Sequence, residues 1–240
     1  MKSLKNIIYI LLLSVIVFGC NEEEFLDRQP ITTISTKSYF ETPEQFKEAV
    51  MGAYTNLHDL YSNDGSGGIG GWGGSAWSFA EVRSDNTTCQ YNRIDQSSYD
   101  WWDMDQFLMA PQNRILEPAW DNCYSAIGKC NTILYYLQDK EIEDKAHYSA
   151  EAKFLRAFYY FYLVRYFGDV PLVTKKVESM EEAFKLNKRT PKDQVYSQIV
   201  SDLNEAKQNL PESYSASDQG RATSGAARTL LAKVLMWQGQ

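Results

Sequence analysis

The residues best suited to bind a ligand gather in a segment between residues 62 and 111 that is rich in tryptophan and glycine. Seven of the fourteen glycines lie between Gly65 and Gly74, and four of the six tryptophans fall in the same segment. Amides, carboxylates and a guanidinium group are interleaved with the aromatic rings, and the candidate set is Trp72, Trp77, Tyr91, Asn92, Arg93, Trp101 and Trp102. Flat rings accept an apolar ligand face, while planar polar groups hydrogen-bond to hydroxyls at its edge. This combination fits the C–H face and the hydroxyl fringe of a sugar ring.

The length of this segment supports a role in function. Loops this long are usually either functional or disordered, and disordered segments are poor in aromatic residues. An alternative stays open, because tryptophan and tyrosine also serve as hydrophobic pins that fix a long loop to a helical body.

Patterns for catalysis and metal binding are weak. A GxGxxG match between Gly68 and Gly73 has no strand before it and no dinucleotide-binding unit around it. The carboxylates of Asp100, Asp103 and Asp105 could chelate a hard cation or act as a glycosidase pair, but beside tryptophans they more often form a polar rim. The GxSxG and HExxH patterns are absent, and the two histidines stand far apart. We therefore expect no catalytic residue, metal ion, cofactor or enzymatic activity.

The first twenty residues have the pattern of a lipoprotein signal. Lys2 and Lys5 precede an uncharged, mostly apolar run from Ile7 to Phe18, which as a helix would reach only about 18 Å of the roughly 30 Å needed to cross a bilayer. The small residue before Cys20 resembles a lipobox, in which the cysteine is acylated, although valine stands where leucine is commonest. We expect a signal peptide over residues 1–19 and a lipidated Cys20. A secreted protein with a chance cysteine is the alternative.

Charge and cysteine count argue against a nucleic-acid-binding protein and against a disulfide-rich one. Loss of residues 1–19 removes two lysines and changes the formal net charge from −7 to −9. After Cys20 an odd number of cysteines remains, Cys89, Cys123 and Cys130, which does not indicate a disulfide framework. On one helix the last two would lie about 10 Å apart, too far for a disulfide, so we expect them to be buried.

A central helix is expected to position the rest of the chain. Between residues 152 and 167 only three residues are charged, so a helix there must be buried on most sides. Gly168 is expected to end it in a left-handed conformation, and Pro171 leads into an extended segment. Thr42 and Thr190, each followed by proline, are expected helix caps. Apolar residues three and four apart indicate further helices over about 42–60, 115–137, 190–210 and 222–237.

Small apolar residues recur at a spacing of 75 residues. Each group of three lies in the second helix of an expected helix pair: Ala152, Leu155 and Ala157, then Ala227, Leu230 and Ala232. Alanines let helices approach closely, as in tetratricopeptide repeats. The expected fold class is all-α, with tetratricopeptide-like helix pairs in an α–α superhelix and a long irregular Gly/Trp-rich loop insertion. Chance similarity between two helices rich in alanine and leucine is the alternative.

Three separated motifs agree in their order and spacing. They are the lipobox with its acidic follow-on and FLD at Cys20–Asp27, FLRAFYYFYLVRYFGDVPLVT at Phe154–Thr174, and GRATSGAARTLLAKVLMWQG at Gly220–Gly239. Together they resemble the SusD/RagB family of outer-membrane nutrient-binding lipoproteins. Family members are considerably longer. The resemblance therefore implies a lipid-proximal tether over residues 20–41 and an N-terminal helical domain over residues 42–240, with the chain truncated before the C-terminal half.

The resemblance also implies a function and partners. Acylated Cys20, a site for palmitate, would hold the protein in the cell outer membrane, and Asn21–Glu24 resembles the acidic signal that directs such lipoproteins to the outer face. The protein would bind a glycan and deliver it to a SusC-like TonB-dependent transporter. Two alternatives stay open, a peptide-binding lipoprotein of the same fold and a helical-repeat scaffold that binds only protein. Binding residues vary between members, so none is carried over by position.

Overall fold

The computed structural model describes residues 39–61, 75–89 and 99–239. The chain divides into two units, residues 1–40 and 41–240, and the elements below belong to the second unit.

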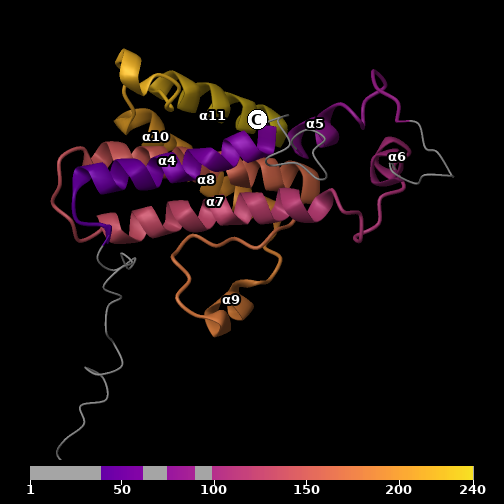
Figure 1. Ribbon diagram of the computed structural model, residues 1–240, viewed down its shortest axis with the longest axis horizontal. Coiled ribbons are helices and arrows are strands. Elements are labelled where there is room, and N and C mark those ends of the chain that lie inside the picture. Colours follow the sequence, from indigo (N-terminus) through magenta and orange to yellow (C-terminus); the bar gives the residue numbers. More distant parts are fainter. Residues whose placement is uncertain (1–38, 62–74, 90–98, 240) are drawn as a thin grey trace, which may run out of the picture. The chain divides into compact units, whose positions relative to one another are not determined.

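The described part is helical, which confirms the predicted all-α class (Figure 1). It contains no β-strand, only an isolated antiparallel bridge between Val170 and Thr190. Its elements, in chain order, are α4 (Pro43–Tyr61), α5 (Ser75–Ala80), α6 (Tyr99–Asp105), α7 (Leu116–Leu137), α8 (Lys145–Phe167), α9 (Met180–Leu186), α10 (Lys192–Asn209), the short 3-10 helix η2 (Ala216–Asp218) and α11 (Ser224–Gln238).

Helix α8 is buried on nearly all sides, as predicted. The four consecutive residues Tyr159–Tyr162 are each at most 2% exposed. Successive helix residues point about 100° apart, so four of them cover the whole circumference. Helices α4, α7 and α10 pack against α8 and provide this cover. Burial of an aromatic side chain of this size contributes about 1.5–3 kcal/mol, which makes α8 the centre of the core.

The long helices form two consecutive pairs. Helices α7 and α8 pack against each other across a short connection, and α10 and α11 pack against each other across a longer connection that contains η2 (Figure 1). This arrangement confirms the predicted tetratricopeptide-like helix pairs. The spacing of 75 residues also places Ala152 and Ala227 at fully buried positions of the second helix of each pair. The match ends there, because Leu230 is half-buried and Ala232 is exposed, whereas Leu155 is buried.

Helix α4 begins with the predicted capping box. The Oγ1 of Thr42 accepts a hydrogen bond from the backbone N–H of Gln45 at 3.4 Å, and Gln45 Oε1 accepts from the N–H of Thr42 at 2.9 Å and of Glu41 at 2.8 Å. These bonds satisfy N–H groups that have no partner inside the helix.

The turn after α8 depends on a glycine and caps the next long helix. Gly168 has φ 69° and ψ −121°, a positive φ as predicted, although ψ lies outside the left-handed helical region. Asp169 Oδ1 then accepts from the backbone N–H of Lys192 at 2.8 Å, at the start of α10. The prediction that Thr190 caps this helix is wrong. Its Oγ1 accepts instead from the N–H of Leu172 at 3.3 Å, because Thr190 is held in the β-bridge.

Three short α-helices and the 3-10 helix η2 were not predicted. Helices α5 and α6 lie in the segment expected to be irregular, and α9 lies in the connection before α10. Helix α9 begins with a capping box, in which Ser179 Oγ accepts from the N–H of Glu182 at 3.2 Å and Glu182 Oε2 accepts from the N–H of Glu178 at 3.0 Å. No residue of α9 is buried, and its seven residues are too few for a periodic pattern to identify a helix.

Arg156 of α8 forms a buried ion pair that joins three helices. Its Nε and Nη2 donate to the two carboxylate oxygens of Asp202 in α10, each at 2.8 Å. Its Nη1 donates to Asn131 Oδ1 in α7 at 2.8 Å and to the carbonyl oxygen of Thr174 at 3.1 Å. Asn131 Nδ2 donates to the carbonyl oxygen of Val173 at 2.8 Å. This network holds the extended segment after α8 against the helices.

Glu151 of α8 forms a second buried ion pair. It accepts from Arg221 Nε at 3.0 Å and Nη2 at 2.5 Å, and from the hydroxyl of Tyr54 in α4 at 3.0 Å. The Tyr54 oxygen in turn accepts from the N–H of Ala222 at 2.8 Å, just before α11. Burial and the neighbouring Glu151 carboxylate raise the pKa of Tyr54, so its hydroxyl stays a donor.

Cys123 and Cys130 are fully buried and unpaired, as predicted. Burial in apolar surroundings raises the pKa of each thiol to about 12.

The predicted signal peptide, nearly all of the tether, and Cys20 lie outside the described residues. Among the helices that the structure describes, none is both long and apolar enough to span a membrane.

Candidate ligand-binding site

Three of the seven residues predicted to bind ligand lie in the described part of the chain. Trp77 is on α5, and Trp101 and Trp102 are on α6. The other predicted residues lie outside the described residues: Trp72, Tyr91, Asn92 and Arg93.

Trp101 joins α6 to α5. Its indole Nε1 donates to the buried Oγ of Ser78 at 3.0 Å. Trp77, the neighbour of Ser78, is 47% exposed, while Trp102 is half-buried. Trp101 therefore acts at least in part as a pin between the two short helices, and Trp77 presents its ring to solvent.

The carboxylates of this segment hold the backbone in place. Asp100 Oδ1 accepts from the N–H of Arg114 at 3.0 Å, Asp100 Oδ2 accepts from the Nε of Arg114 at 2.7 Å, and Asn113 Nδ2 donates to the Asp100 carbonyl at 2.8 Å. Asp105 Oδ2 accepts from the N–H of Cys89 at 3.3 Å. Within the described ranges, no group of three or more His, Cys, Asp or Glu residues could hold a metal ion.

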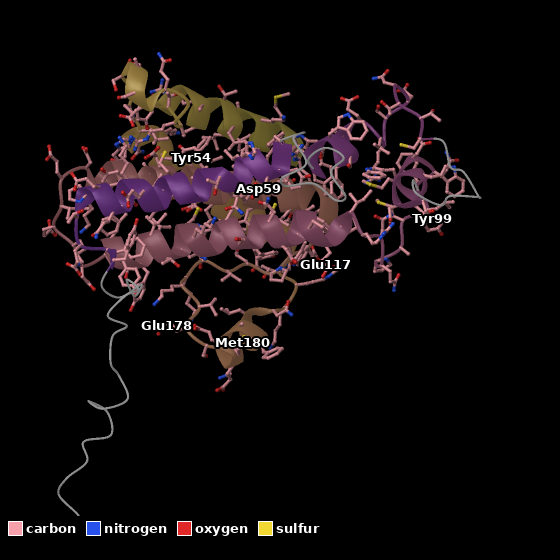
Figure 2. The ribbon with its side chains drawn as sticks, in the orientation of Figure 1. Tyr54, Asp59, Tyr99, Glu117, Glu178 and Met180 are labelled. Atoms are coloured by element: carbon pink, nitrogen blue, oxygen red, sulfur yellow. The ribbon has the colours of Figure 1, made fainter. Side chains whose placement is uncertain are left out.

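An exposed aromatic edge, formed by Trp77, Tyr99, Phe107 and Leu108, lies on and after these two short helices. Each of the four side chains is at least 47% exposed. Figure 2 shows Tyr99 on α6, beyond the end of the long helices. Phe107 has φ 57°, a left-handed conformation that costs a non-glycine residue about 1–3 kcal/mol. The guanidinium carbon of Arg83 lies 5.1 Å from the centre of the Phe107 ring and helps to hold it there.

A cavity of about 620 Å³ lies between α5, the segment after α6, the start of α7 and the end of α8. We call it the aromatic cavity. Its walls include Phe79, Glu117, Trp120, Tyr166, Phe167 and Arg189. The volume falls within the range of about 300–1,000 Å³ that is usual for small-molecule sites.

The rings of the aromatic cavity support one another. Phe79 of α5 lies 4.8 Å from Tyr166 and 5.9 Å from Phe167, both in the last turn of α8, measured between ring centres. Trp120 of α7 meets Phe167 edge to face, with ring centres 5.1 Å apart. Three helices thus fix flat apolar surfaces around one space.

Two charged side chains of opposite sign border the aromatic cavity. Glu117 and Arg189 are both exposed, and Figure 2 shows Glu117 at the start of α7. Neither side chain forms a hydrogen bond or ion pair with another residue in the described ranges. A carboxylate and a guanidinium without protein partners can both bind ligand hydroxyls.

The aromatic cavity differs from the site that the sequence predicts. None of the three described candidate tryptophans is among the described residues that line it. Trp120 is half-buried. The sequence predicts that α8 is buried on most sides. That prediction holds for Tyr159–Tyr162, but Tyr166 and Phe167, in the last turn of α8, line the cavity.

The only sequence signal for these residues is that aromatic side chains continue to the last residue before Gly168. Periodicity cannot tell a ring that faces a cavity from a ring that faces a neighbouring helix.

Comparison with known proteins gives a consistent family. The family model for SusD-like proteins, described as starch-binding associating with outer membrane, matches residues 24–236. The SusD-like protein P2 of Formosa agariphila is 29% identical over an alignment of 244 positions, which covers 100% of this chain and 44% of that protein. A SusD-like protein of Bacteroides ovatus is 25% identical, over 97% of this chain and 39% of its own length.

Comparison with solved structures points to the same family. A laminarin-binding SusD-like protein has a TM-score of 0.70 at 27% identity, over 83% of this chain and 41% of that chain. The surface glycan-binding protein A of Bacteroides thetaiotaomicron, in complex with laminarihexaose, has a TM-score of 0.66 at 26% identity, over 83% and 40%. The chain thus spans less than half the length of these relatives. Because the family model matches most of the sequence and the fold agrees, this chain belongs to the SusD-like family.

Proposed function

We propose that the protein binds a glycan in the aromatic cavity and on the adjoining exposed aromatic edge, and that it is a binding protein rather than an enzyme. One observation carries the proposal: three helices surround one cavity with aromatic rings, and its two bordering charged groups have no partner in the described part of the chain. Similar structures named for laminarin and laminarihexaose support a glycan as the ligand class.

The exposed edge would extend the site beyond the cavity. Trp77 offers an indole ring for stacking, because it is 47% exposed. Trp102 stays a proposed ligand-binding residue, as do Trp72, Tyr91, Asn92 and Arg93, which lie outside the described residues.

Isothermal titration of the purified full-length protein with laminarin, starch and a mixture of short peptides tests the ligand class. Binding of a polysaccharide but not of the peptides supports the proposal. Binding of peptides alone would favour a peptide-binding lipoprotein, and binding of neither would leave a scaffold that binds only protein.

Substitution of the two charged residues then tests the cavity. Arg189→Ala and Glu117→Ala should each weaken glycan binding about tenfold or more, because a hydrogen bond to a charged group is worth about 1.5–3 kcal/mol. Both residues are exposed, so the fold should be unaffected. Lys185→Ala, on exposed α9, is the control. Unchanged glycan affinity in both cavity variants would show that the binding site lies elsewhere.

We further propose that Cys20 is acylated after removal of residues 1–19, that the protein faces outward from the outer membrane, and that it delivers its ligand to a SusC-like TonB-dependent transporter. The description of the matched family, as associating with the outer membrane, supports the location. Radiolabelled palmitate should enter the wild type but not Cys20→Ala. Protease treatment of intact cells should digest the wild-type protein, and a barrel transporter should co-purify with it. Protection from protease would overturn the outward orientation.

A further inference from the structure

A second cavity lies between α7 and the segment that contains α9. It has a volume of about 370 Å³. Trp120, Tyr124 and Gly128 of α7 form one wall, and Val173, Lys175 and Leu186 belong to the opposite wall. We call it the α9 cavity. Nothing above assigns it a ligand.

Trp120 is among the residues that line both cavities. The segment between α8 and α10 contributes residues to both cavities at each of its ends. Phe167 and Arg189 line the aromatic cavity, while Pro171 and Asn187, a few residues away in the sequence, line the α9 cavity. One ligand could therefore contact residues of both cavities.

A glycine keeps the α9 cavity open. Gly128 lies in the middle of α7, where glycine is a poor helix former. A Cβ built at this position would meet nothing within 4 Å, so packing does not require a glycine there. A side chain at position 128 would instead enter the cavity that the glycine lines. Gly52 of α4 is also a helical glycine with nothing within 4 Å, but it lies outside this cavity.

The polar atoms around this cavity are largely occupied by the protein. The Tyr124 hydroxyl donates to the carbonyl oxygen of Pro171 at 2.7 Å, and the Asn131 side chain bonds to Val173 and Arg156. The inner wall therefore offers mainly the flat rings of Trp120 and Tyr124. Such a surface suits the C–H face of a sugar ring.

Helix α9 can adjust to a ligand. None of its residues is buried, and Met180 is 72% exposed. The contacts that hold it include its capping box and exposed ion pairs such as Lys175–Glu182 at 2.5 Å. Segments with few buried contacts open at low free-energy cost.

We propose that a glycan bound in the aromatic cavity continues past Trp120 into the α9 cavity, which would then be a further sugar-binding subsite. This inference rests on the proposed function. The lining of the α9 cavity runs from Trp120 to Thr132, about 18 Å along α7. Several sugar units fit along such a track.

A length series of laminari-oligosaccharides, from disaccharide to hexasaccharide, tests the track with the full-length protein. Wild-type affinity should rise with length. Gly128→Leu fills the α9 cavity and should weaken binding of the hexasaccharide about threefold to tenfold, the equivalent of one lost aromatic contact, while binding of the disaccharide is unchanged. Gly52→Leu, the matched helical glycine, should leave both affinities unchanged.

The outcomes separate the two proposals. If the wild type binds the hexasaccharide and Gly128→Leu binds it equally well, the track is overturned while glycan binding stands. Equal weakening of the hexasaccharide and the disaccharide would also overturn it, because the α9 cavity would then not act as an extension. If the wild type binds none of laminarin, starch and these oligosaccharides, the proposed function fails and the track fails with it. Thermal melting of both leucine variants confirms that they fold.

Discussion

Two charged side chains on the most buried helix, Glu151 and Arg156, illustrate what burial demands of a single residue. Glu151 is 0% exposed and Arg156 is 5% exposed. Each is compensated by a bidentate partner, Arg221 and Asp202 respectively. A buried ion pair of this kind adds little net stability, but removal of one partner leaves an uncompensated charge in the core. These residues therefore matter more for which helices can pack together than for how tightly they do so.

Arg156→Met should destabilise the protein by about 3–5 kcal/mol, because Asp202 would remain buried without its partner. The double variant Arg156→Met/Asp202→Leu should recover much of this loss. Urea unfolding measures both. Lys185→Met, which breaks an exposed pair with Glu181, should change stability by no more than about 0.5 kcal/mol. A double variant no more stable than the single one would contradict this account.

The buried thiols predict a loss of stability in alkali. Burial raises the pKa of Cys123 and Cys130 from 9.0 to about 12. Above about pH 9 the unfolded chain loses these protons while the native state keeps them, so the unfolded state binds fewer protons and the free energy of unfolding falls.

Between about pH 8 and about pH 10 the loss should be about 1.4 kcal/mol for each thiol. Urea unfolding at both pH values should show a smaller loss in Cys123→Ala/Cys130→Ala. An identical pH dependence in the two proteins would argue against a thiol origin.

At the scale of elements, sequence patterns reveal the long helices with a periodic apolar face and miss the short helices. The long helices could be predicted because their apolar residues recur every three or four positions and their caps are local in sequence, as at Thr42. Helix α9 could not be found from periodicity, since its one local signal is the capping box at Ser179. The residue that caps α10 could not be predicted from the local sequence either. Its carboxylate comes from Asp169, 23 residues before Lys192, brought there by the β-bridge.

Two glycines should respond in opposite ways to alanine. Gly168→Ala should cost about 1–3 kcal/mol, because φ 69° with ψ −121° is strained for a residue with a Cβ. Gly52→Ala should instead stabilise by about 0.5–1 kcal/mol, since the position is helical and open. Thermal unfolding of the two variants side by side checks the difference in sign. A neutral Gly168→Ala would show that the turn can relax.

At the scale of the whole molecule, the proposed site brings together segments that are far apart in the sequence. Phe79, Trp120, Phe167 and Arg189 come from four separate stretches, and only the packing of α5, α7 and α8 unites them. The sequence could suggest a sugar-binding chemistry from clustered tryptophans, but not a cavity whose walls are more than 100 residues apart along the chain. Trp120 shows the reason: an aromatic residue on a regular helix has the same spacing whether it faces the core or a cavity.

The ion pairs of α8 also bear on how this unit comes apart. Arg156 pairs with α10 and Glu151 with the residue before Ala222, so both tie the first helix pair to the second. In a tandem array of independent repeats, one end can fray while the other stays folded. Here, release of the second pair would break both ion pairs together with the packing of α8 against α10, so partial unfolding is penalised.

Residues 41–239 should therefore melt in one cooperative transition, with calorimetric and van't Hoff enthalpies equal. A variant without either ion pair should melt in two steps; it combines Glu151→Gln/Arg221→Gln with Arg156→Met/Asp202→Leu. A single sharp transition in that variant would show that the cooperativity does not come from the ion pairs.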